Sequence, residues 1–304
     1  MRIISYRKDG APGVGVMVDD DGFVDIGKAA PDLPATLRGI LELEDDGLAR
    51  VREAAAGKPA DISLGDVELD PVIPEPHAIW ALALNFEMHL EETSLTTSNE
   101  YPQIFLRTPA SQTGHGRPLL CPDPAIAMPF DYEGELAVVI GKKGRHIKAD
   151  AMAPHIAGYS IYNEGSVRQF QQHNRQFGLG KNFEQSGSFG PWLMTSDEFG
   201  DPDDHTLITR LNGVEKQHAS LGEMIFSVGE VIQYLSTGYA LRPSDVIVMG
   251  TPGAILPPPD WQPGPNDSKR VRGRTHMNPG DTVEVEISGL GTLVNPVVAD
   301  GWTP

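Results

Sequence analysis

The chain has little cysteine, and this limits the kinds of site it can build. Cys121 is the only cysteine among 304 residues, which excludes an intramolecular disulfide framework and a cysteine-rich metal site. A single free thiol suits a reducing compartment, so we expect a cytoplasmic protein. Cys121 stands in the segment LLCPDP, where no basic neighbour would lower the pKa of its thiol. We therefore do not expect it to be a nucleophile.

Positive charge is also scarce, and long apolar runs are missing. The 24 Lys and Arg residues face 42 Asp and Glu, for a formal net charge of -18. Such a surface repels phosphate backbones and anionic lipid, which argues against nucleic acid and membranes as partners. No apolar run has the length of a membrane span, and the start MRIISYRKDG lacks the apolar core of a secretion signal. No glycine-rich nucleotide motif follows a predicted strand, so a nucleotide-binding fold is not expected.

Glycine and proline are plentiful, and this favours a strand-rich fold. The chain has 33 Gly and 26 Pro, with 39% hydrophobic residues to form a core. Short strands joined by tight turns have this composition, so we predict an α+β fold dominated by strands. Residues 1–30 read as strands and 32–57 as a helix, and the composition changes near residue 71. We therefore expect a small N-terminal α/β module, 1–70, before a larger unit, 71–304.

Within the larger unit, two local patterns are especially clear. Asn212-Gly213 lies between two strand-like runs and predicts a hairpin turn. The segment SLGEMIFSVGEVIQYLSTG, residues 220–238, has apolar residues at helical spacing and predicts an amphipathic helix.

Two glutamates in FDYEGELAVVIGKKG are the first candidates for a functional site. Glu133 and Glu135 are two residues apart on a predicted strand, so their side chains leave the same face. The strand continues as LAVVIG and is expected to enter the core, where two carboxylates are costly unless a cation compensates them. Oxygen ligands without cysteine suit Mg²⁺, Mn²⁺ or Ca²⁺. The alternative is a solvent-facing pair on an edge strand.

Further candidates lie in three other polar segments. Glu164 follows the apolar run AGYSIY at a turn that could aim its carboxylate, although a surface turn residue is the simpler reading. His89 and Glu92 are three residues apart, so one helical turn would let the carboxylate orient the imidazole. Lys181 follows two glycines in FGLGKNFE, where the backbone could approach a ligand. Taken singly, the His-x-x-Glu pair and the lysine are weak signals.

Together, these segments resemble the fumarylacetoacetate hydrolase family over roughly residues 71–304. The matches occur in the family's order, and the N-terminal block matches only loosely. The segments that carry the resemblance are ALNFEMHLEE, IFLRTPASQTGHG, FDYEGELAVVIGK, GYSIYNEGSVRQFQ, GLGKNFEQSGSFGPWL, RLNGVEKQHASLGEMIFSVGEVIQYLS, DVIVMGTPGAI and PGDTVEVEISGLGTLVNPV.

The resemblance implies a mixed fold with a β-sandwich roll, a homodimer, and a Mg²⁺ or Mn²⁺ ion on two Glu and one Asp. The two Glu fall on Glu133 and Glu135. The third ligand falls on Glu164, where this chain has Glu in NEGS and the family has Asp in NDVS. The longer side chain could bind directly, shift the ion or act through water. Gly165 replaces the family's Val and could let the backbone relax around the longer ligand.

The resemblance also implies roles for the residues that would act on substrate. It makes His89 the general base oriented by Glu92, and Lys181 the residue that stabilises oxyanion charge. The residues expected to hold the substrate are Arg107, Arg168, Gln171, Gln217 and Thr251. Arg107 is itself a departure, because the family has Lys there, and a guanidinium cannot act as a base. The stretch 254–278 is longer than the family's usual link and reads as an active-site-adjacent loop or as a surface insertion.

The activity expected from this resemblance is divalent-metal-dependent hydrolysis of a C–C bond in a 2,4-dioxo, acylpyruvate-type acid, as in aromatic or sugar-acid catabolism. Decarboxylation, isomerisation or hydration of a related 2-oxo or 2-hydroxymuconate-type acid is the alternative within the family. A non-catalytic binding protein on the same scaffold is the alternative of another class, motivated by Glu164 in place of Asp.

Overall fold

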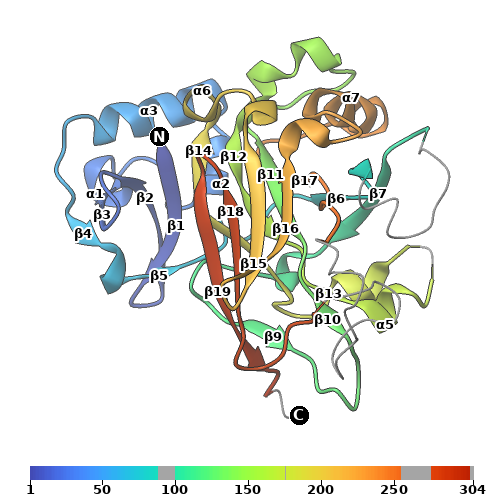
Figure 1. The fold of residues 1–304 in the computed structure, drawn as a ribbon. Helices are drawn as coiled ribbons and strands as arrows, with labels where there is room; N and C mark the ends of the chain where they lie inside the picture. Colours follow the sequence, from blue (N-terminus) through green and yellow to red (C-terminus); the bar gives the residue numbers. More distant parts are fainter. Residues whose placement is uncertain (88–99, 175, 255–274, 302–304) are drawn as a thin grey trace.

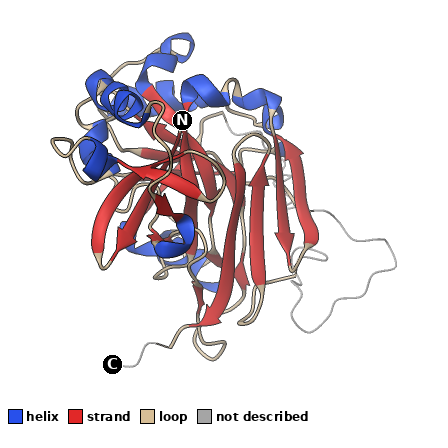
Figure 2. Cartoon of the chain, turned by 90° about the vertical axis from the view of Figure 1, so that its left-hand side faces the viewer, coloured by secondary structure: helices blue, strands red, loops and turns tan. Residues whose placement is uncertain are grey.

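The computed structural model describes residues 1–87, 100–174, 176–254 and 275–301, and its strands form a mixed, strand-rich α+β fold (Figure 1). This confirms the expected fold class. Most of the longer helices gather near one end of the strands (Figure 2). Within the described residues, no helix is long and apolar enough to cross a membrane.

The largest sheet is a mixed one in which the central strands come from distant parts of the sequence. Its main path runs in the order β4 (Ile62–Ser63), β3 (Gly22–Asp25), β2 (Ala11–Met17), β1 (Arg2–Lys8), β14 (Gly187–Thr195), β12 (Ile156–Asn163), β11 (Gly134–Ile140), β17 (Val246–Val248), β6 (Ile79–Ala83) and β7 (Gln103–Arg107). Off this path, β5 (Glu68–Leu69) pairs with β1, and β8 (Gln112–Thr113) pairs with β14. Among its described strands, only the β17–β6 and β14–β8 pairs are parallel.

A second sheet packs across the central strands of the first. It runs in the order β16 (Val214–Ser220), β15 (Thr206–Leu211), β18 (Thr282–Ile287), β19 (Gly291–Ala299) and β9 (Leu119–Cys121). The predicted turn at Asn212-Gly213 joins β15 to β16, and both residues have positive φ as a tight hairpin requires. A short pair, β10 (Phe130–Asp131) with β13 (Ser166–Val167), lies beyond the ends of β11 and β12.

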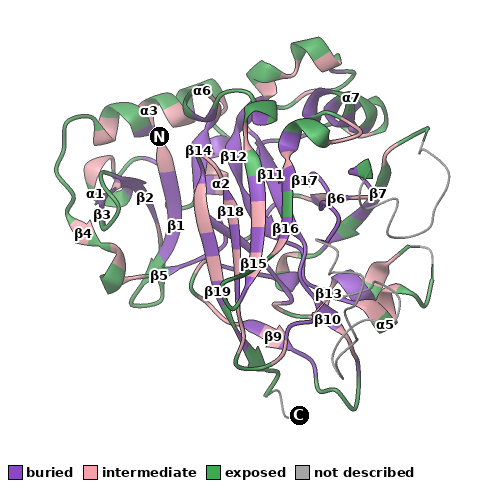
Figure 3. Ribbon diagram, in the orientation of Figure 1, coloured by how far each residue is buried: buried purple, intermediate pink, exposed green. Residues whose placement is uncertain are grey.

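Strand β11 is buried on both faces, which explains its unbroken apolar sequence. Leu136, Val138 and Ile140 belong to the core shared with the second sheet and the helix α7 (Val228–Gly238). The alternate residues, Ala137 and Val139, belong to a second core beneath α2 (Leu37–Leu41) and α3 (Asp45–Ala55). The buried band in Figure 3 follows these central strands.

Two predicted helices differ from the observed ones. The expected helix at 32–57 is divided into α2 and α3, because Glu44 takes a φ of 52° just before α3. The expected helix at 220–238 begins only at Val228, because Ser227 caps it in a reciprocal pair with Glu230. The segment before this cap, Leu221–Glu223, forms a single 3-10 turn.

The N-terminal segment extends the large sheet. Strand β1 pairs antiparallel with β14, with Arg2 opposite Met194 and Ile3 opposite Leu193. Residues 1–30 form the expected strands β1, β2 and β3, but they end in a short helix, α1 (Ile26–Ala29), where a strand was expected. The strands continue the sheet that contains β11 and β12. The division near residue 71 stays a prediction about folding units.

Asp245 generates a prediction for stability because it is a fully buried carboxyl directly before β17. It accepts hydrogen bonds from the Arg242 backbone N–H (2.7 Å) and the Tyr239 hydroxyl (3.4 Å), yet burial raises its pKa to about 6. Since the folded state binds this proton more tightly than the unfolded state, folding stability falls as pH rises from about 4 to 6. We expect Asp245→Asn to remove this dependence while keeping an acceptor for Arg242.

Urea unfolding between pH 4.5 and 7.5 measures the effect. The free energy of unfolding of Asp245→Asn, relative to wild type, should rise by about 1–3 kcal/mol across this range and level off above the folded pKa. Asp150→Asn, on an exposed residue, serves as the control. Parallel pH profiles for wild type and Asp245→Asn would contradict the prediction.

Candidate metal centre

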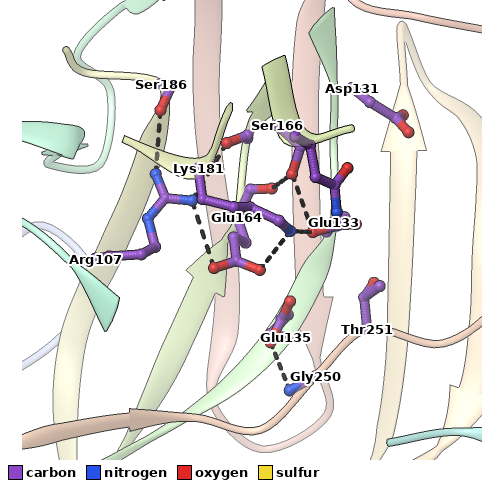
Figure 4. Close-up of polar contacts among 12 residues, drawn as sticks. Arg107, Asp131, Glu133, Glu135, Glu164, Ser166, Lys181, Ser186, Gly250 and Thr251 are labelled. Atoms are coloured by element: carbon purple, nitrogen blue, oxygen red, sulfur yellow. Dashed lines mark hydrogen bonds and ion pairs between the residues drawn. The ribbon is translucent and has the colours of Figure 1, made fainter. Parts of the chain in front are cut away.

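Three buried glutamates converge where β11 begins and β12 ends. Glu133 and Glu135 flank the first residue of β11, and Glu164 follows the last residue of β12. The antiparallel register places Gly134 opposite Asn163, and the Glu164 backbone N–H donates to the Glu133 carbonyl at 2.7 Å. One carboxylate oxygen from each glutamate lies within 4.8 Å of the others (Figure 4). The predicted pair and its predicted third partner therefore form one cluster.

Lys181 lies against two of these carboxylates. It ends the short turn Gly178–Lys181 and is buried, with an exposed fraction of 3%. Its Nζ donates to Glu133 Oε2 and, at 2.7 Å, to Glu164 Oε2. The Ser166 hydroxyl also donates to Glu133 Oε2, at 3.1 Å. The buried ammonium therefore orients Glu133 and Glu164 and offsets part of their repulsion.

Arg168 holds Glu133 from the other side. It begins the helix α5 (Arg168–Gln171), and its Nη2 donates to Glu133 Oε1 at 2.7 Å and to Asp131 Oδ2 at 2.6 Å. Its Nη1 donates to Gln171 Oε1 at 2.8 Å. Burial lowers the pKa of Arg168, but the charges of Glu133 and Asp131 outweigh burial and raise it overall. Arg168 therefore stays a cation.

Glu135 differs from the other two glutamates in its partners. Its Oε2 accepts a hydrogen bond from the Gly250 backbone N–H at 2.5 Å, and in the part of the chain that the structure describes no basic side chain hydrogen bonds to it. Burial, and then the charges of Glu164 and Glu133, raise the pKa of Glu135 well above its ordinary value. The buried Oε1 of Glu164 accepts no hydrogen bond from the described residues either. The negative charges of Glu135 and Glu164 are therefore only partly compensated by the protein, and their carboxylates converge. Such an arrangement is suited to binding a cation.

Gln217 and Thr251 connect the strand that carries the glutamates to the loop after β17. Gln217 Oε1 accepts from the Gly134 N–H at 3.0 Å, and its Nε2 donates to Thr251 Oγ1 and the Pro252 carbonyl, both at 2.8 Å. Thr251 Oγ1 donates to the Gly134 carbonyl at 3.0 Å. Both side chains thus fix Gly134, the residue between Glu133 and Glu135.

Known proteins resemble this chain along almost its whole length. The family model described as "Fumarylacetoacetate (FAA) hydrolase C-terminal" matches residues 78–298. The chain belongs to the fumarylacetoacetate hydrolase family. This confirms the resemblance inferred from the ordered motifs, and the glutamate cluster lies inside the matched segment.

Three members of the fumarylacetoacetate hydrolase family illustrate its range. Oxaloacetate tautomerase YisK of Bacillus subtilis is 32% identical over 303 residues, which cover 93% of this chain and 95% of that protein. A mitochondrial oxaloacetate tautomerase of Homo sapiens is 31% identical, covering 98% of this chain and 92% of its own. The solved fumarylacetoacetate hydrolase of Exiguobacterium antarcticum is 27% identical with a TM-score of 0.78, covering 98% and 99% of the two chains. Relatives of this chain are thus enzymes.

The structure brings most of the sequence-predicted family residues to one place and leaves others undescribed. Contacts join Glu133 to Lys181 and Arg168, and they join Glu164 to Lys181 and Arg107. Arg168 also contacts Gln171, and Glu135 lies in the same cluster beside the Gly250 N–H. Gln217 and Thr251 reach the same strand through Gly134. His89 and Glu92 lie outside the described residues, as does most of the 254–278 stretch, so their roles stay predictions.

Sequence reasoning missed several residues that contact this set. Asp131 shares Arg168 with Glu133, Ser166 donates to Glu133, and Ser186 accepts from Arg107. Asp131 could have been found, because positions 131, 133 and 135 alternate in FDYEGE. The two serines carry no comparable signal, because their contacts with Glu133 and Arg107 join residues that are distant in the sequence.

Gly165 generates a prediction for packing beside the cluster. A Cβ at this position would lie 1.7 Å from the Ser186 carbonyl oxygen and 3.1 Å from the Phe130 ring. We expect Gly165→Val, which introduces the residue that the resemblance implies at this position, to lower the free energy of unfolding by about 2 kcal/mol or more. Gly238→Ala is the matched control, because its Cβ would meet no atom within 4 Å. Equal urea midpoints for the two variants would show that the turn can move aside.

Glu135 generates a second prediction, for the metal-free protein. Glu135→Gln keeps an acceptor for the Gly250 N–H and removes a carboxyl whose charged form is disfavoured by burial and by its two neighbouring glutamates. We expect its Tm in EDTA to rise by roughly 1–3 °C over wild type. Addition of Mn²⁺ should raise the Tm of wild type more than that of the variant. Thermal unfolding measures both, with the exposed Glu53→Gln as the control. A lower Tm in EDTA together with an unchanged Mn²⁺ response would refute the assignment.

Proposed function

We propose that this chain is a divalent-metal-dependent enzyme that interconverts the keto and enol forms of a small 2-oxo acid of the oxaloacetate type. The observation that carries the proposal is the cluster of Glu133, Glu135 and Glu164, in which Glu135 has no basic hydrogen-bond partner in the described part of the chain. Relatives at 31–32% identity over more than nine-tenths of this chain carry the name oxaloacetate tautomerase and support this choice of reaction.

The three glutamates would hold Mg²⁺ or Mn²⁺, since buried carboxylate oxygens suit such ions. When bound, the ion supplies Lewis-acid chemistry, drawing electron density from the 2-oxo group and favouring loss of a proton from the neighbouring carbon. The residues around the site would then bind and orient the acid.

The charges around the cluster favour an anionic substrate. Four carboxylates, those of Asp131, Glu133, Glu135 and Glu164, meet three basic side chains, those of Arg107, Arg168 and Lys181. When all seven groups are ionised, their net charge is -1, and a bound divalent ion changes the net charge of the site to +1. A 2-oxo carboxylate would therefore be attracted to the loaded site.

The proton steps of the reaction would fall to side chains that can exchange protons. Tautomerisation breaks a C–H bond beside the carbonyl and forms an O–H bond on its oxygen, so one group must accept a proton and one must supply it. Arg168 stays charged and cannot be the acceptor. Lys181, with its ammonium at the edge of the cluster, is suited to donate to an oxygen that gains negative charge. His89, oriented by Glu92, is the proposed base.

Hydrolysis of a C–C bond in an acylpyruvate-type acid is the second candidate, favoured by the His89-x-x-Glu92 pattern. In that reaction His89 would take a proton from water as the water adds to the distal carbonyl. The bond between the two carbonyl-bearing fragments then breaks, and the released carbon takes up a proton. The two reactions share the same metal ligands and differ in whether water attacks.

We also propose a cytoplasmic homodimer, by analogy with the family.

One set of assays separates the two activities. With Mg²⁺ or Mn²⁺, we expect the wild type to convert enol-oxaloacetate to the keto form at least 100-fold faster than it releases pyruvate from acetylpyruvate. Glu135→Ala should lose at least 100-fold of this activity, because a metal ligand is gone, while the exposed Glu53→Ala should keep it. His89→Ala should lose about 100-fold or more if His89 is the base.

The opposite ranking of the two substrates would assign the chain to hydrolysis. Metal binding by calorimetry with no turnover of either acid would instead favour a non-catalytic binding protein. Near-normal rates for Glu135→Ala would remove the glutamate cluster from the mechanism.

A further inference from the structure

The guanidinium of Arg107 donates hydrogen bonds from each of its nitrogens to acceptors within the chain. Arg107 ends β7, and its side chain is buried. Its Nε donates to Ser111 Oγ at 3.1 Å, and its Nη2 donates to the Ser111 carbonyl at 3.2 Å and to Ser186 Oγ at 3.1 Å. Its Nη1 donates to the Gly165 carbonyl at 3.2 Å. All three of its nitrogens are therefore bound by the protein, which leaves little for a substrate carboxylate.

The same Nη1 also faces the metal cluster. It lies 3.5 Å from Glu164 Oε1, the oxygen that accepts no hydrogen bond from the described part of the chain (Figure 4). The other oxygen of Glu164 is fixed by Lys181 at 2.7 Å. Arg107 thus holds the backbone just after Glu164 while its positive charge lies beside the second oxygen of that side chain.

Three side chains or backbone groups meet at this contact: the guanidinium of Arg107, the carboxylate of Glu164 and the backbone of Gly165. A lysine has one ammonium on a flexible stem and cannot reproduce the fixed fork that joins Ser111, Ser186 and Gly165. A side chain at Gly165 would collide with the Ser186 carbonyl, so the close approach of these turns requires glycine. The carboxylate of Glu164 and the guanidinium of Arg107 are therefore packed together at the turn that contains Gly165.

We propose that Arg107 is a positioning residue that aims the longer carboxylate of Glu164 at the metal. This role rests on the metal site proposed above and differs from the binding of a substrate carboxylate. Arg107 fixes the turn at Gly165 and attracts Glu164 Oε1, so the extra methylene of Glu164 does not carry its carboxylate away from Glu133 and Glu135. Arg107 then contributes to metal affinity only through Glu164.

A double-mutant cycle on Mn²⁺ affinity tests this role without an activity assay. Free Mn²⁺ is titrated by electron paramagnetic resonance against wild type, Arg107→Lys, Glu164→Asp and the double variant. We expect Arg107→Lys to weaken Mn²⁺ binding about tenfold in wild type but less than twofold in the Glu164→Asp background. The shorter aspartate withdraws from Nη1 by about one bond length, so it loses the interaction that the arginine provides.

Arg168→Lys is the matched control, because Arg168 pairs with Glu133 rather than Glu164. Its effect on Mn²⁺ affinity should be the same, within twofold, in wild type and in the Glu164→Asp background. Near-ultraviolet circular dichroism and Tm in EDTA report folding separately. If Arg107→Lys does not fold, Ser186→Ala replaces it. This variant removes one of the two acceptors of Nη2 and leaves the Ser111 carbonyl and the charge of Arg107 in place. Its smaller loss of Mn²⁺ affinity, about threefold, should also vanish in the Glu164→Asp background.

Equal losses for Arg107→Lys in both backgrounds, with Mn²⁺ still bound, would overturn the positioning role and leave the metal site standing. The positioning role is also overturned if Arg168→Lys shows as much coupling to residue 164 as Arg107→Lys does. Failure of the wild type to bind Mn²⁺ at all would overturn both the metal site and the role of Arg107.

Discussion

The burial of several carboxylates at the junction of β11 and β12 constrains the rest of the fold around it. A buried carboxylate is tolerated only when cations or hydrogen bonds replace its lost water. Glu133 receives Lys181, Arg168 and Ser166, while Glu164 receives Lys181 and faces Arg107. These partners come from the end of β7, from β13 and the helix after it, and from the Gly178–Lys181 turn, so distant parts of the chain must fold together before the charges are compensated.

The rigid support of the cluster comes from the strand beneath it. Because β11 packs on both faces, the backbone between Glu133 and Glu135 is fixed by the core and by the hydrogen bonds of Gln217 and Thr251 to Gly134. A site on such a strand keeps its carboxylates close despite their repulsion. Burial of apolar side chains elsewhere in the fold supplies the free energy that holds these carboxylates together. Glu135 therefore stays available to bind an ion.

The sequence was sufficient for the parts of the site that follow a period or a motif. Because Glu133 and Glu135 are two residues apart on a strand, the sequence predicted that they share one face. The order of the family motifs then predicted that Glu164 lies beside them, and the three glutamates do form one cluster. The start of α7 was also readable, since Ser227 and Glu230 have the capping-box spacing, although the apolar pattern alone suggested an earlier start. The hydrogen bonds of Arg107 were not readable. They depend on how Arg107 approaches Gly165 and Ser186, which lie 58 and 79 positions further along the chain.

The pairing of β1 with β14 links the first residues of the chain to the far side of this site. Strand β14 begins at Gly187, directly after the serine that accepts from Arg107, and β1 covers the edge of β14 near its other end. An uncovered strand edge is a template for pairing with another chain. Strand β1 therefore protects the edge of β14. Loss of β1 would expose that edge, and β14 could then pair with a strand of another molecule.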